Sequence, residues 1–247
     1  MWKKLIIGLL LTNSAWAYKL TSDFTNGFYW QSLPINITVV ESDSNLKSKL
    51  EYLSKLAVQD WERNTGLDLW NETNGGTSNV IRWSTNFAAE TKMDPASVLA
   101  VAIRYTDGPY FAKTEIIING NHVYNQQNNY LLTTITHELG HTMGLDHSDV
   151  YNAIMAPSLQ LNSNGVQQDD SQGIEYAVSE TLHRQEIGYV SPLAYQSDEE
   201  SKSPLSCGTV AVTTSASASP LSGLFSLAAG ILIGFVRRIR LWLKRFF

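Results

Sequence analysis

Two histidines and a glutamate near the middle of the chain have the types and spacing of a zinc site. His137 and His141 are four residues apart, so on a helix their imidazoles lie on the same face, one turn from each other. Two neutral imidazoles at this spacing can share one Zn²⁺, and Glu138 would point into the same cavity. Gly144 permits the positive φ that ends a helix, and the turn can bring His147 round as a third ligand.

This set of ligands predicts a catalytic zinc and not a structural one. Three protein ligands leave the fourth position of the metal open for water. Zinc lowers the pKa of that water from 15.7 towards about 7, so a hydroxide nucleophile becomes available near neutral pH. Glu138 is predicted to take the proton as a general base and to pass it later to the leaving amine.

The residues around this motif resemble the metzincin metallopeptidases, and within them the matrixin branch. Residues 137–147 read His-Glu-x-x-His-x-x-Gly-x-x-His, and residues 153–157, with Met155, are similar to the methionine turn that follows this signature. Ser148, directly after the third histidine, is the residue found there in matrixins. Residues 169–174 (Asp-Asp-Ser-Gln-Gly-Ile) are similar to the run that opens the last matrixin helix.

The resemblance implies roles for residues outside the zinc motif. Met155 would lie beneath the three histidines as a hydrophobic base, and Pro157 would line the S1′ pocket. Asp169 and Asp170 would be structural, pinning the chain N-terminus and the methionine turn. The substrate backbone is expected to add to an edge strand of the sheet, a recurring way to hold an extended peptide. An alternative role for Asp23 is to cap the zinc before activation.

The elements that must position these residues form an α+β fold. The resemblance implies a twisted, mainly parallel sheet with an antiparallel edge strand, a long first helix, an active-site helix and a C-terminal helix. The active-site helix is predicted to start at Asn128 or Asn129, and the last helix at Asp169. Segment 88–96 fits neither a helix nor a strand clearly. Apolar periodicity predicts the other elements: a long helix over 46–66 and strands over 33–40, 80–83, 98–105 and 114–119.

The two ends of the chain differ in composition from its middle. Residues 1–17 have two lysines, a short apolar run and an Ala-Trp-Ala cleavage site, and are predicted to be a secretory signal peptide. A short segment, 18–29, precedes a predicted catalytic domain over 30–188. Residues 189–220, rich in Ser, Thr, Ala and acids, are predicted to be a linker. The protein is therefore expected to be exported, to work outside the cytoplasm, and to stay at the cell envelope or surface.

The final segment, 221–247, is predicted to be a transmembrane or sorting tail. Its first 16 residues are uncharged and mainly apolar, and five Lys and Arg residues follow them. With Cys207 just upstream, the tail resembles the C-terminal sorting signals of Gram-negative bacteria. That resemblance implies an intramembrane protease that processes the tail, with Cys207 as a point of lipid attachment. The alternative is a plain single-span membrane anchor.

The charge distribution and the motifs limit which partners and functions are consistent with the sequence. Residues 1–17 hold 2 and residues 237–247 hold 5 of the 18 Lys and Arg but none of the 23 acids, so residues 18–236 carry a net charge of −12. Such an acidic body argues against nucleic acid as a partner. The favoured function is a zinc endopeptidase that acts on extracytoplasmic proteins or peptides. Two alternatives stay open: a zinc-binding adhesion protein without turnover, and a zinc amidase that acts on cell-wall peptides.

Overall fold

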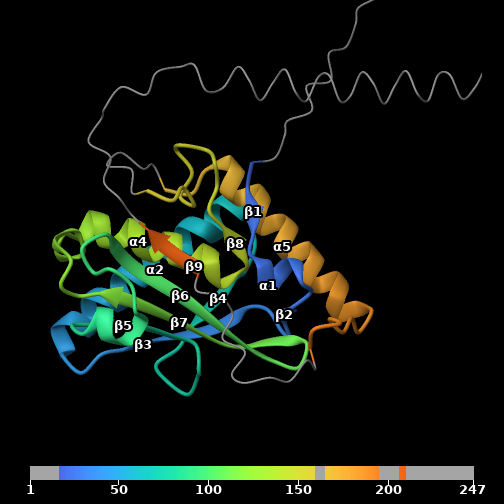
Figure 1. Ribbon diagram of the computed structural model, residues 1–247, viewed down its shortest axis with the longest axis horizontal. Helices are drawn as coiled ribbons and strands as arrows, with labels where there is room; N and C mark the ends of the chain where they lie inside the picture. Colours follow the sequence, from blue (N-terminus) through green and yellow to red (C-terminus); the bar gives the residue numbers. More distant parts are fainter. Residues whose placement is uncertain (1–16, 159–164, 195–205, 210–247) are drawn as a thin grey trace, which may run out of the picture. The chain divides into compact units, whose positions relative to one another are not determined.

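A twisted sheet of seven strands is the centre of the domain in the computed structural model, which describes residues 17–158, 165–194 and 206–209 (Figure 1). In spatial order the main path runs β4 (Trp70–Glu72), β3 (Ile35–Val40), β5 (Val80–Ser84), β7 (Tyr110–Asn119), β6 (Val98–Asp107) and β9 (Ser206–Thr209). The short strand β2 (Tyr29–Trp30) pairs with the start of β7.

The directions of these strands match the predicted fold class. Strands β2, β3, β4, β5 and β7 pair in parallel, whereas β6 runs antiparallel to β7. The mainly parallel sheet with an antiparallel edge strand is therefore confirmed. Ile116, Ile117 and Ile118 of β7 are all buried, as expected for a strand whose two faces are both covered. The sequence did not anticipate β9, which pairs antiparallel with β6 and lies inside the predicted linker.

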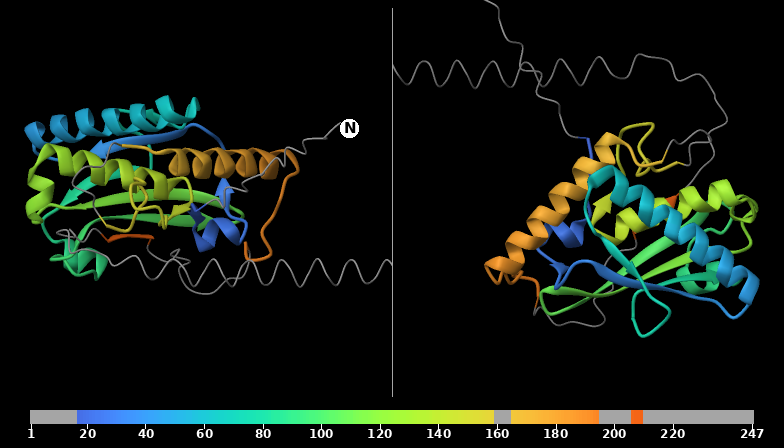
Figure 2. Two further views of the ribbon diagram at one scale, coloured as in Figure 1. Left: turned by 90° about the horizontal axis from the view of Figure 1, so that it is seen from above. Right: turned by 180° about the vertical axis from the view of Figure 1, so that it is seen from behind.

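The long helices lie together on one face of the sheet (Figure 2). They are α2 (Ser44–Thr65), α4 (Asn128–Thr142) and α5 (Gln168–Glu186). Helix α2 starts where the Asp43 side chain accepts a hydrogen bond from the Leu46 N–H and ends at Gly66 in the left-handed region, φ 69°. Its apolar stripe packs into the main core through Leu50, Leu53, Ala57, Val58 and Trp61.

The sequence predicted where helices α4 and α5 begin more accurately than which residues cap them. Helix α4 begins at Asn128 as predicted, but the capping residue is Gln127, whose side chain makes no capping bond. Helix α5 begins one residue before Asp169, after Gln167, and the Asp170 side chain completes a capping box. The ambiguous segment 88–96 overlaps the short helix α3 (Phe87–Thr91), which packs on the opposite face of the sheet from α4.

The N-terminal segment is an integral part of the fold. Strand β1 (Lys19–Leu20) pairs antiparallel with β8 (Leu145–Asp146), the short strand that follows α4. After helix α1 (Ser22–Thr25), the Trp30 indole N–H donates to the carbonyl of Thr142 at the end of α4, at 2.8 Å. Both contacts hold the segment that leads from α4 to His147.

The targeting predictions fall outside the part of the chain that the structure describes. Residues 1–16, which make up almost all of the predicted signal peptide, and the predicted tail at 221–247 are not among the described residues. No helix within 17–158 or 165–194 is long and apolar enough to span a membrane. Signal peptide, tail and domain boundaries therefore stay predictions.

Candidate metal centre

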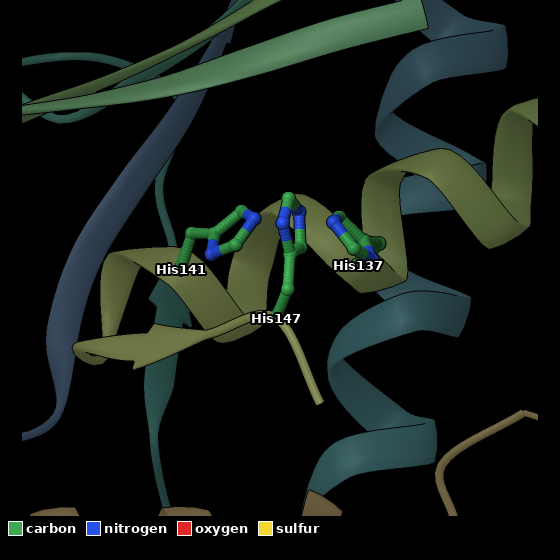
Figure 3. Close-up of side chains that lie close together, drawn as sticks. All are labelled: His137, His141 and His147. Atoms are coloured by element: carbon green, nitrogen blue, oxygen red, sulfur yellow. The ribbon is translucent and has the colours of Figure 1, made fainter. Parts of the chain in front are cut away.

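Three histidines, two on α4 and one just after β8, converge on one point (Figure 3). His137 and His141 project from the same face of α4, and the chain then turns at Gly144, where φ is 96°. Strand β8 carries the backbone back, so that His147 faces the other two rings. One nitrogen of each imidazole lies within 4.8 Å of those of its partners, which is a spacing that one metal ion can bridge.

Backbone carbonyls fix the orientation of the two helical histidines. The Nδ1–H of His137 donates to the carbonyl of Ile154, and the Nδ1–H of His141 donates to the carbonyl of Leu145, both at 2.7 Å. These bonds leave each Nε2 with its lone pair directed away from the backbone, as a metal-binding histidine requires. The buried Nε2 atoms of His137, His141 and His147 have no hydrogen-bond partner among the described residues.

The electrostatics keep these imidazoles neutral. Burial, reinforced by the neighbouring His147 ring, lowers the pKa of His137 to about 3. Burial and the other two histidines lower the pKa of His141 well below its usual value, and burial also lowers that of His147. Only a neutral imidazole offers a lone pair, so three unpartnered Nε2 atoms fit a divalent cation such as zinc.

Glu138 is fully buried beside the histidines. Neither of its carboxylate oxygens accepts a hydrogen bond of normal geometry among the described residues. Burial raises its pKa well above the usual range, and the backbone amide of Ala102 on β6 opposes that shift only in part. A buried, unpartnered carboxyl is costly unless a ligand or water completes its hydrogen bonds, so Glu138 suits a role in holding a water or ligand.

Met155 packs against the helix that carries His137 and His141. Its side chain contacts α4 at Gly140, the residue just before His141. A Cβ at position 140 would lie 2.9 Å from Cζ2 of Trp61 and closer still to the Met155 sulfur. Glycine is therefore required here for close packing, and its role was not apparent from the sequence.

Two aspartates at the start of α5 hold the loop that contains Met155. Asp170 accepts hydrogen bonds from the backbone N–H groups of Ile154 and Met155, at 2.8 and 3.0 Å. Asp169 accepts from the hydroxyl of Ser148 at 2.6 Å and from the backbone N–H of Ala17 at 3.2 Å. The pair thus ties together the methionine loop, the residue after His147 and the N-terminal segment, as the resemblance implied.

The comparison with protein families agrees with this geometry. The family model described as matrixin matches residues 29–177, which is more than half of the chain. The chain belongs to the matrixin family. Matrixins are zinc-dependent metallopeptidases, so this protein is a metallopeptidase of that class and its substrates are proteins or peptides. No curated protein matches the chain well enough to serve as a named relative.

The structure contradicts the alternative role of Asp23 in this matrixin. The Asp23 carboxylate is buried against the guanidinium of Arg104, with N···O distances of 2.8 and 2.9 Å. Arg104 also donates to the carbonyl of His141. Asp23 is therefore part of a structural ion pair, not a zinc cap. The sequence contains one indication of this ion pair, because Arg104 is a charged residue at the end of the apolar run 98–103.

Of the remaining candidate residues, Pro157 lies just after the methionine loop, and Cys207 and His122 lie outside the histidine cluster. Pro157 follows the methionine loop with its side chain exposed, and residues 159–164 after it are not described, so its S1′ role stays a prediction. Cys207 lies on β9, opposite Val101 of β6. His122 bonds to the Ala96 carbonyl and to the Tyr124 N–H, which indicates a structural role.

Proposed function

We propose that this matrixin is an endopeptidase that cleaves extracytoplasmic proteins or peptides, with a zinc held by His137, His141 and His147. The observation that carries the proposal is Glu138: a fully buried carboxyl, next in the chain to His137, that accepts no hydrogen bond of normal geometry among the described residues. A surface or core glutamate of a binding protein has no need of such a position. This argues against an adhesion protein that lacks turnover.

The residues have separate tasks in the proposed reaction. Bound zinc supplies a water of lowered pKa and polarises the scissile carbonyl. Glu138 orients the attacking water, accepts its proton and returns that proton to the leaving amine. The carbonyls of Ile154 and Leu145 keep the Nδ1 atoms of two histidines protonated, so that each Nε2 stays available as a ligand.

The location of this activity is part of the proposal and is supported by sequence alone. The predicted signal peptide over 1–17 and the predicted tail over 221–247 favour an exported protein held at the cell envelope by a membrane segment. The intact mass of the mature protein, extracted from membranes, reports both termini and any lipid on Cys207. A complete tail with an unmodified Cys207 would contradict the sorting-signal hypothesis and leave the plain anchor.

Glu138→Ala tests the chemistry. General-base removal is expected to lower kcat by about 10² to 10⁴-fold on a quenched peptide or a denatured protein. Zinc content should stay at one per chain, because the three ligands remain. Glu175→Ala is the matched control, since Glu175 is an exposed glutamate on α5 away from the histidines.

The result also separates the alternatives. A wild-type protein without any proteolysis that a chelator stops would contradict the endopeptidase proposal. Parallel digestion of proteins and of purified cell wall distinguishes an endopeptidase from an amidase that acts on wall peptides. Cleavage of the wall alone would favour the amidase.

A further inference from the structure

The edge of the sheet beside the metal centre is occupied by a distant part of the same chain. Strand β9 (Ser206–Thr209) pairs antiparallel with β6, and the partners are Ala102 with Ser206, Val101 with Cys207 and Ala100 with Gly208. Without β9, strand β6 would be the edge of the sheet within the described residues. A short extended segment has therefore added itself to the antiparallel edge (Figure 1).

This edge borders the catalytic helix. Ala100 and Ala102 pack in the main core with Ile135 and Leu139 of α4, so β6 lies directly against that helix. The backbone amide of Ala102 faces the carboxyl of Glu138. Strand β9 itself also contacts α4. Ser206 is thus paired with Ala102, a residue of β6 whose amide faces the proposed general base.

An exposed edge strand offers unpaired N–H and C=O groups that an extended peptide can join. One edge pairs with one strand at a time, so a peptide substrate and β9 exclude each other. We propose that Ser206–Thr209 is an intramolecular occupant of the substrate-binding edge, which keeps the peptidase latent until a substrate or a change in the tail displaces it. This inference rests on the proposed peptidase function.

The nature of the segment suits reversible occupancy. Ser-Cys-Gly-Thr contains no large apolar residue, so backbone hydrogen bonds dominate its pairing and its intrinsic affinity is low. Its place in the same chain compensates, because an intramolecular segment can bind at an effective concentration on the order of 1 mM. A free substrate in the micromolar range then competes poorly, whereas freeing the segment opens the edge completely.

Adjacent prolines test the pairing in the zinc-loaded, full-length protein. Successive N–H groups of a strand point to opposite sides, so Cys207→Pro with Gly208→Pro removes one that faces β6 in either register. Cys207→Ala with Gly208→Ala is the matched control, because it removes the thiol but keeps both N–H groups. The proline pair should raise kcat/KM on a short quenched peptide about tenfold, and the alanine pair should stay within about twofold of wild type.

Hydrogen exchange supplies a readout that does not depend on activity. Amides of residues 98–102 should be protected in wild type and in the alanine pair, and should exchange faster in the proline pair. Equal activity and equal exchange in both variants would overturn the inference. Activation by the alanine pair would overturn it too, because the thiol and not the strand would then hold the enzyme latent. Faster exchange in the proline pair, with no cleavage by any form, would support the occupied edge and contradict the peptidase function.

Discussion

Removing the charge of Asp23 should destabilise the domain strongly, although this residue lies far from the zinc ligands in sequence. Its carboxylate is 5% exposed and contacts an Arg104 side chain that is 1% exposed. In Asp23→Asn the guanidinium stays buried without a counter-charge. Loss of one partner of a buried pair typically costs about 3 to 5 kcal/mol, a large share of the roughly 5 to 15 kcal/mol that stabilises a domain.

A double-mutant cycle measures this pair. Urea unfolding of wild type, Asp23→Asn, Arg104→Met and the double variant gives the four free energies. We expect the asparagine variant to lose about 3 kcal/mol, and Arg104→Met to restore about 2 kcal/mol of it, because the orphaned charge is gone. Asp149→Asn is the control: it breaks the exposed pair with Lys19 and should cost less than about 1 kcal/mol.

The same variants decide between two roles for Asp23. A zinc cap predicts that Asp23→Asn raises peptidase activity and leaves stability unchanged. The ion pair predicts the reverse, with weaker zinc retention, because Arg104 also holds the carbonyl of His141. A loss below about 1 kcal/mol, or no recovery in the double variant, would refute the structural role.

Two further predictions concern the metal centre. Gly140→Ala should lower the free energy of unfolding by about 1 to 2 kcal/mol, because crowding against Met155 outweighs the helix-propensity gain of about 1 kcal/mol. Adding Met155→Ala should recover part of this loss. Unchanged stability of Gly140→Ala in urea unfolding would contradict the close packing. The metal-free protein should lose stability as pH falls from 7 to 5. The pKa of His137 is about 3 when folded and near 6.5 when unfolded, so the unfolded state binds the proton first, which costs about 2 kcal/mol for this residue alone. A flat pH dependence of urea midpoints in chelator would show that these histidines are not buried and neutral.

The histidine cluster could be predicted from the sequence because it depends on local spacing. His137 and His141 are fixed by one turn of helix, and Gly144 by the need for a positive φ, so the ligand cluster follows from residues 137 to 147. The long helices were predictable for a related reason: their apolar residues repeat with the helical period over several turns.

What the sequence did not reveal depends on contacts between distant residues. The pairing of Asp23 with Arg104 joins positions 81 residues apart, and no local pattern encodes it. Strand β9 was missed because Ser206–Thr209 has a linker-like composition, and backbone pairing at an edge does not require apolar side chains. Gly140 looked like an ordinary helical position, since only the packed Met155 shows why a Cβ is excluded.

The contacts of the N-terminal segment limit the order in which the domain can fold during synthesis. Leu20 pairs with Leu145, roughly 125 residues later in the chain, and the carbonyl of Phe24 accepts from Arg184, which comes later still. At about 5 to 20 residues per second, a ribosome needs roughly 6 to 25 seconds to cover the first of these gaps. Leu20 and Phe24 are therefore made early, but they can form these contacts only late in synthesis. The strand that leads to the third histidine can pair with β1 only after residue 146 has been made, so a shorter growing chain cannot form this pairing.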